Sequence, residues 1–184
     1  YNIYKESSCN SGIYSFIGTH PYNSLSEFVD LNTDVSNITS YKMSVNDKCG
    51  NESALSISSN VIRLAVFNYN GLNILVWNKY IGSPVQGYNV WRKVNNVWTK
   101  LTLTPIQATI FTDSAAVGVE YSIEAPLTYS CTSFKATTYG STRSNSEAAK
   151  TSDALSAGFM SSTNTINAGE SIEFTDATTG GATA

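Results

Sequence analysis

An internal duplication constrains the fold of this chain more than any other feature. The opening stretch Tyr1-Asn2-Ile3-Tyr4-Lys5 recurs as Tyr88-Asn89-Val90-Trp91-Arg92. Three further blocks follow both copies in the same order: Gly12-Ile13-Tyr14, Phe28-Val29-Asp30 and Tyr41-Lys42-Met43-Ser44-Val45 after the first, and Asn96-Val97-Trp98, Phe111-Thr112-Asp113 and Tyr121-Ser122-Ile123-Glu124-Ala125 after the second. Blocks that recur in one order, roughly 80 to 90 residues apart, indicate a duplicated domain near the small end of domain size.

The first copy, residues 1–58, has the period of β-strands. Tyr1 and Ile3 fall on one side of a strand and Asn2 and Tyr4 on the other. Short strands separated by turn residues predict an antiparallel β-sandwich, but only about four or five strands fit into this stretch. One sheet would then have an uncovered inner face. We therefore expect this unit to be incomplete at its start and the chain to be an excerpt of a longer polypeptide.

The second copy, residues 61–140, supplies a whole sandwich. Seven strands are predicted: Val61–Tyr69, Leu72–Trp77, Tyr88–Val94, Val97–Leu103, Thr109–Thr112, Val119–Ala125 and Phe134–Tyr139. Asn70-Gly71 is a strong signal for a two-residue hairpin turn, and Trp77 is the expected centre of the core. Tyr41 and Tyr121 each begin the penultimate strand of their copy, where we expect the tyrosine hydroxyl to bond back to the backbone.

These blocks resemble fibronectin type III domains, on Trp77, Tyr88-Asn89-Val90-Trp91-Arg92, Phe111-Thr112-Asp113 and Tyr121-Ser122-Ile123. Tyr1-Asn2-Ile3-Tyr4-Lys5 with the Ser44 to Ser53 stretch looks like the fibronectin type III repeats of large secreted surface proteins of Bacteroidota. Residues 141–156 read as a linker because Leu155 is the only large apolar residue. Residues 157–184 resemble the first strands of a PKD domain. The expected fold is all-β, with tandem immunoglobulin-like sandwiches whose first and last units are incomplete.

Four aromatic residues are the candidate binding residues. If Tyr88 and Val90 face the core, alternation turns Trp91 outward. Tyr4 holds the same place in the first copy, and Tyr14 and Trp98 lie on the strands that follow. Such aromatic residues serve as cross-strand packing, as a contact for another protein or neighbouring module, or as a platform for surface glycans.

Catalysis is not expected. His20 is the one histidine, and no sequence motif marks a partner serine for it. Carboxylates such as Glu27, Asp30, Glu120 and Glu124 are expected on solvated faces and turns, because a slim sandwich offers no cleft for paired acids. No zinc spacing, calcium loop or phosphate-binding motif is present, so no cofactor or metal is expected.

Charge excludes further classes of partner. Only 14% of the residues are charged and the net charge is -3, which disfavours nucleic-acid binding. No apolar run approaches the roughly 20 residues of a membrane helix, so direct membrane insertion is not expected. Cys9 and Cys49 are predicted at opposite ends of their unit, too far apart for a disulfide, and the pairing of Cys131 stays open. Asp113-Ser114-Ala115 resembles the O-glycosylation sequence of exported Bacteroidota proteins, and its position just after a predicted strand would expose Ser114.

The resemblance implies an extracellular or cell-surface location and export by type IX secretion. The leading expectation is a non-catalytic modular segment that acts in adhesion or surface assembly, including gliding motility. The alternative is an accessory spacer or glycan-binding region of a secreted hydrolase. Fold does not separate these functions, because the same sandwiches serve both.

Overall fold

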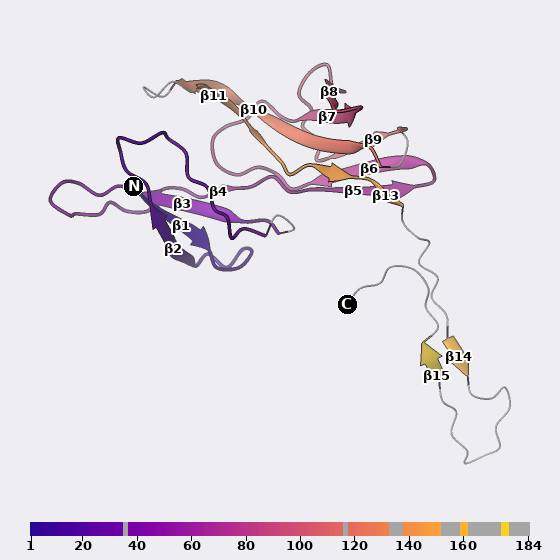
Figure 1. Ribbon diagram of the computed structural model, residues 1–184, viewed down its shortest axis with the longest axis horizontal. Helices are drawn as coiled ribbons and strands as arrows, with labels where there is room; N and C mark the ends of the chain where they lie inside the picture. Colours follow the sequence, from indigo (N-terminus) through magenta and orange to yellow (C-terminus); the bar gives the residue numbers. More distant parts are fainter. Residues whose placement is uncertain (35–36, 116–117, 133–137, 152–158, 162–173, 177–184) are drawn as a thin grey trace, which may run out of the picture.

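Every regular element in the described part of the chain is a β-strand (Figure 1). The computed structural model describes residues 1–34, 37–115, 118–132, 138–151, 159–161 and 174–176. The strands form sheets in two sequence-related units, in which one short pair is parallel and the other pairs are antiparallel, and a separate hairpin follows them. The predicted all-β fold is therefore confirmed.

The first unit is a single sheet. Its strands are β1 (Asn2–Glu6), β2 (Tyr14–Thr19), β3 (Ser40–Ser44) and β4 (Ser59–Asn60), in the order β2-β1-β3-β4. The sheet ends beyond the predicted boundary at residue 58, because Ser40 of β3 pairs with Asn60 of β4.

The second unit is a two-layered β-sandwich (Figure 1). Its strands are β5 (Leu64–Tyr69), β6 (Leu72–Trp77), β7 (Asn89–Val94), β8 (Val97–Lys100), β9 (Ile110–Asp113), β10 (Glu120–Thr132), β11 (Thr138–Arg143), β12 (Glu147–Ala148) and β13 (Lys150–Thr151). One layer has the order β11-β10-β7-β8, with β12 also paired to β10. The other has the order β13-β5-β6-β9. The predicted strands recur with shifted ends, most clearly in β10, which continues well past Ala125.

The core of the second unit lies between these layers. Leu75 and Trp77 of β6 face Val90 of β7 and Ile123 of β10, and all four side chains are buried. The ring of Trp77 meets the ring of Tyr88 edge-on, with centroids 5.6 Å apart. Trp77 thus takes the central place predicted for it, and truncating a core aromatic of this kind costs about 3 to 5 kcal/mol.

A tight turn sets the register of the first core hairpin. Asn70 and Gly71, between β5 and β6, have φ values of 51° and 78°. Left-handed conformations at both central residues define a turn that follows the right-handed twist of paired strands. Leu64 consequently pairs with Trp77 and Tyr69 with Leu72.

The linker predicted at residues 141–156 is wrong over its first part. β11 runs to Arg143, and β12 and β13 follow within the expected linker. The side chain of Asn145 accepts a hydrogen bond from the Leu64 N–H at 2.8 Å and donates one to the Leu64 carbonyl at 3.1 Å. Ala149 is buried in the core. The side-chain amide of Asn145 and the small side chain of Ala149 thus attach this stretch to the sandwich, although it has no large apolar residue. Residues 152–156 lie outside the described part of the chain.

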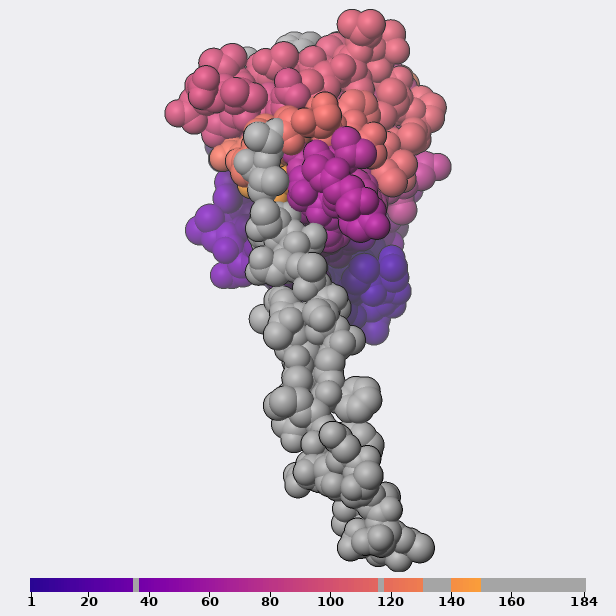
Figure 2. All heavy atoms as spheres, turned by 90° about the vertical axis from the view of Figure 1, so that its right-hand side faces the viewer, coloured from indigo at the N-terminus to yellow at the C-terminus, as the bar shows by residue number. Residues whose placement is uncertain are grey.

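The two units meet at Asn60, which is buried. Its side-chain amide donates to the Lys79 carbonyl at 3.0 Å and accepts from the Ile81 N–H at 2.7 Å. Its backbone N–H donates to the Ile81 carbonyl at 3.0 Å, and the hydroxyls of Ser59 and Tyr80 lie 3.0 Å apart. These contacts join the last strand of the first unit to a loop of the second. Seen along its length, the molecule has the first unit behind and below the second (Figure 2).

In the region predicted to resemble a PKD domain, the structure describes one short hairpin. β14 (Phe159–Ser161) pairs antiparallel with β15 (Phe174–Asp176), and Phe159 lies opposite Asp176. The other residues of 157–184 lie outside the described part of the chain.

Candidate functional site

The same sheet is built twice at the level of individual residue pairs. In the first unit β1 lies between β2 and β3, and Lys5 pairs with Tyr41. In the second unit β7 lies between β8 and β10, and Arg92 pairs with Tyr121. Each pair joins the last residue of one repeated block to the first residue of another. The duplication seen in the sequence is thus also a duplication of strand register.

On the inward side of the second unit, a cation, a carboxylate and a tyrosine form one cluster. Arg92 Nη1 lies 3.1 and 3.0 Å from the two carboxylate oxygens of Asp113 on β9. The Tyr121 hydroxyl donates to Asp113 Oδ2 at 2.7 Å and accepts from the amide of Asn73 at 2.8 Å. Burial, followed by the bond to Asp113, raises the pKa of Tyr121 to about 12. The cluster joins β7 and β10 of one layer to β6 and β9 of the other.

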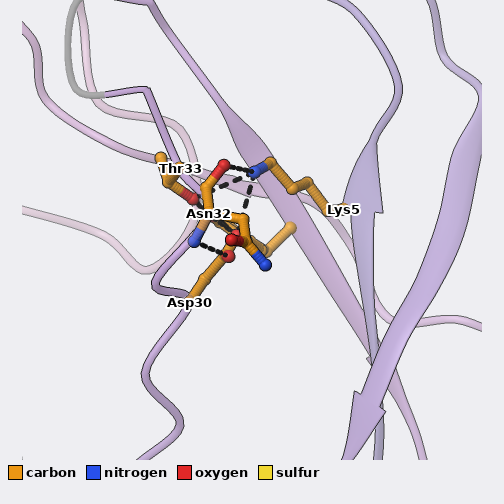
Figure 3. Close-up of polar contacts among 5 residues, drawn as sticks. Lys5, Asp30, Asn32 and Thr33 are labelled. Atoms are coloured by element: carbon orange, nitrogen blue, oxygen red, sulfur yellow. Dashed lines mark hydrogen bonds and ion pairs between the residues drawn. The ribbon is translucent and has the colours of Figure 1, made fainter.

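The first unit has the equivalent cluster in Lys5, Asp30 and Tyr41. Lys5 Nζ lies 3.0 Å from Asp30 Oδ2, and Tyr41 donates to the same oxygen at 3.0 Å. Figure 3 shows Lys5 reaching from β1 to the turn of Asp30, Asn32 and Thr33, where it also donates to the Asn32 carbonyl at 3.1 Å. Hydrogen bonds from Thr33, Lys5, the Asn32 N–H and Tyr41 hold the pKa of Asp30 well below its ordinary value, against the desolvation that raises it.

These clusters correct two expectations. The hydroxyls of Tyr41 and Tyr121 donate to aspartate side chains, where the sequence pattern predicted a backbone partner. Asp30 is also not on a solvated face, since its side chain is only 13% exposed and lies in an ion pair. The signal was present in the repeated Phe-Val-Asp and Phe-Thr-Asp blocks. Their common aspartate marks a shared partner for the cation and the tyrosine.

The outward side of the second unit carries the predicted Trp91. Its indole N–H donates to Glu124 Oε2 at 2.8 Å, and Asn89 donates to the same oxygen at 3.3 Å. The guanidinium of Arg143 lies 5.0 Å from the centroid of the Trp91 ring and 3.7 Å from the Glu124 carboxylate. Although burial alone would raise it, the pKa of Glu124 is lowered by hydrogen bonds, that from Trp91 the largest. Trp91 is therefore held at its indole N–H by Glu124 and on the face of its ring by Arg143.

The outward side of the first unit repeats this arrangement around a different glutamate. The Tyr4 hydroxyl donates to Glu52 Oε1 at 2.6 Å, Asn2 donates to it at 2.9 Å, and Ser44 also bonds to it. Hydrogen bonds from Ser44, Tyr4 and Asn2 lower the pKa of Glu52 to about 2. Ser44 stands at the register position that Glu124 holds in the second unit, so the carboxylate comes from the next loop instead.

The other two predicted aromatics lie beside cations. Lys93 Nζ is 5.8 Å from the centroid of the Trp98 ring, and Lys42 Nζ is 4.5 Å from that of Tyr14. The residue directly opposite Tyr4 is Phe16, with the two ring centroids 5.8 Å apart. The sequence analysis missed Phe16, because its block was matched on Tyr14. All four predicted aromatics thus lie half-buried on outward faces, each with a polar or aromatic neighbour.

Ser114, Cys9 and Cys49 lie where the sequence placed them, whereas Cys131 lies within a strand that was predicted to end at Ala125. Ser114 is exposed and directly follows β9. Cys9 and Cys49 are free and exposed. Cys9 follows β1 and Cys49 follows β3, and because these paired strands are antiparallel and rise about 3.4 Å per residue, the two cysteines lie beyond opposite ends of the pair. Cys131 belongs to β10.

Among the described residues, no three His, Cys, Asp or Glu side chains lie close enough together to hold a metal ion. The described part of the chain also contains no helix with the length and hydropathy needed to cross a membrane. The candidate site is a pair of outward aromatic faces, with Tyr4 and Tyr14 on the first unit and Trp91 and Trp98 on the second. On the inward side of each sheet lies an ion-pair cluster. No known protein family, curated protein or solved structure matches this chain.

Proposed function

We propose that this chain is a non-catalytic segment of a secreted or cell-surface bacterial protein, in which β-sandwich modules act in adhesion or surface assembly. The observation that carries the proposal is the joint at Asn60. Its buried amide bonds to the backbone at both Lys79 and Ile81, so two copies of one sheet are connected without a free linker. Such a joint transmits position and force from one module to the next.

The chemistry of the faces supports this reading. Carboxylates that acid–base catalysis would require hold structural contacts instead: Asp30 pairs with Lys5, Glu120 with Lys93 and Glu124 with Arg143. The strand order shared by the two units supports a fibronectin type III-like architecture, and the hairpin of β14 and β15 supports the start of another module. Partners of such modules are other protein subunits or neighbouring modules of the same polypeptide.

The proposal is tested in cells that produce the protein. Antibodies raised against residues 1–151 should label intact cells, and deleting these residues in frame should reduce attachment or gliding at least several-fold. Restoring the gap with two unrelated sandwiches of equal length is the matched control. Failure of the control to restore attachment assigns adhesion to these modules themselves. Labelling only after permeabilisation, or normal attachment after deletion, would contradict the proposal.

The same joint favours a second candidate, a spacer in a secreted hydrolase. A spacer predicts that the unrelated sandwiches do restore function and that the native polypeptide carries a catalytic domain. Direct glycan binding has less support, because Arg143 and Glu124 already engage Trp91. We therefore expect Trp91→Ala to leave retention on a glycan array unchanged; a clear loss of retention would establish the glycan function.

A further inference from the structure

The inward face of the first unit is open where the equivalent face of the second is closed. Counting from the paired tyrosines Tyr41 and Tyr121, Met43 corresponds to Ile123 and Val45 to Ala125. Met43 and Val45 are 43% and 50% exposed, whereas Ile123 and Ala125 are both 0% exposed. These two apolar positions of the repeated strand are thus about half exposed in the first unit and fully buried in the second.

What closes this face in the second unit is the hairpin of β5 and β6. Leu64 and Val66 of β5, and Leu75 and Trp77 of β6, join the same buried cluster as Ile123. They alternate with exposed or half-buried residues, as expected for a sheet with one covered face. The hairpin also brings Asn73 to the hydroxyl of Tyr121.

In the first unit only part of such a cover is present. The loop between β2 and β3 places the Phe28 ring against Gly18, where a Cβ atom would come within 3.0 Å of that ring, and it places Asp30 on Lys5. By its position in the repeat, this loop corresponds to the β9 region of the second unit. The place of β9 is therefore filled, and the place of the β5–β6 hairpin is open.

We infer that the open inward face of the first unit, at Met43 and Val45, seats a β-hairpin with the alternating apolar pattern of β5 and β6. We assign its source to the same polypeptide, on the amino-terminal side of Tyr1. In the second unit the covering hairpin comes directly before β7, the counterpart of β1, and a duplicated unit keeps its strand order. The occupant is thus a covalently linked strand pair with an apolar inner face, and this inference is independent of where the protein acts.

Oxidation of Met43 by hydrogen peroxide tests the inference, because a covered methionine reacts far more slowly than an exposed one. Rates are measured by peptide mapping on the 184-residue chain and on the polypeptide purified from its native source. Met43 should react as an exposed methionine in the chain and at least tenfold more slowly in the native polypeptide. The variant Val76→Met supplies the control, since Val76 is 39% exposed on the outer side of β6; the methionine introduced there should react at the same rate in both.

Two outcomes would overturn the inference. Equal rates for Met43 in the two preparations would show that nothing upstream covers the face. Protection of Met43 that grows with the concentration of the 184-residue chain, while the control rate stays constant, would show that a second copy covers it.

Discussion

The two units have the same sheet and different covers, and the difference separates two kinds of contact. The ion pair and the tyrosine bond occur in both: Lys5, Asp30 and Tyr41 in one, Arg92, Asp113 and Tyr121 in the other. Deep apolar burial occurs around the second cluster, where the β5–β6 hairpin adds a layer. Strand register and a single loop therefore suffice to place the polar cluster, whereas the core depends on a second sheet.

The largest effect expected from this comparison concerns Ile123 and Met43. Ile123→Ala removes a side chain that is 0% exposed and should lower the free energy of unfolding of the second unit by about 3 kcal/mol, through lost burial and the cavity left behind. Met43→Ala removes a side chain that is 43% exposed, and should cost less than about 1 kcal/mol.

The two losses can be measured separately. All three tryptophans lie in the second unit, so tryptophan fluorescence in urea reports its unfolding alone. Native-state hydrogen exchange of residues 1–60 reports the first unit. A large loss from Met43→Ala would show that the inward face of the first unit is already covered in this chain.

The second prediction concerns the shared aspartates. Asp113→Asn leaves Arg92, whose side chain is 29% exposed, without its ionic partner, and should destabilise the second unit by about 2 kcal/mol, the range for hydrogen bonds to charged groups. Asp30→Asn should produce a comparable loss in the first unit, because Lys5 and Tyr41 both depend on it. The interaction is measured with a double-mutant cycle, in which urea unfolding compares Asp113→Asn, Arg92→Met and the double variant Arg92→Met/Asp113→Asn. Additive losses would show that the pair does not interact.

The third prediction breaks the connection between the two units. Asn60→Ala deletes the two side-chain hydrogen bonds to Lys79 and Ile81 and leaves the partly buried Lys79 carbonyl and Ile81 N–H without these partners, at a cost of about 1.5 kcal/mol. Small-angle scattering should show a broader distribution of inter-unit distances. Ser58→Ala, beside the joint, is the control and should leave the scattering unchanged. An unaltered profile for Asn60→Ala would mean that the joint is held by other contacts.

The sequence predicted what depends on local patterns. Alternation placed Tyr88 and Val90 inside and Trp91 outside, and Asn70-Gly71 marked its hairpin, because period and turn chemistry are properties of neighbouring residues. The repeated blocks contain the residues of both clusters, but the sequence analysis did not predict that these side chains meet.

The rest depended on contacts between distant segments. Asn145 holds Leu64 across the sandwich, so a stretch without large apolar residues belongs to a folded unit instead of a linker. Glu52 takes the role that Glu124 plays in the second unit from a different place in the chain. Block alignment cannot detect such a replacement, because the carboxylate has moved out of its block.

The fourth prediction compares the outward aromatics. Trp91→Phe removes the indole N–H that donates to Glu124 at 2.8 Å, and should lower the free energy of unfolding of the second unit by about 1 kcal/mol. Tyr4→Phe removes an exposed hydroxyl bond to Glu52 and should have a smaller effect. Urea unfolding and hydrogen exchange measure the two. Equal losses would mean that solvent exposure does not distinguish the two faces.

The smallest effect expected is a dependence of the stability of the first unit on pH, caused by Glu52. Hydrogen bonds from Ser44, Tyr4 and Asn2 lower the pKa of Glu52 in the folded chain to about 2, below the value near 4.5 that the free side chain has. A lowered folded pKa stabilises the fold above the unfolded pKa, and this contribution is lost as the pH falls from about 4.5 to about 2. Protection of the first unit from hydrogen exchange, after correction for intrinsic rates, should fall across this window. Glu52→Gln should flatten that fall, because glutamine does not titrate, whereas an undiminished fall would place the acid sensitivity of the first unit on Asp30 instead.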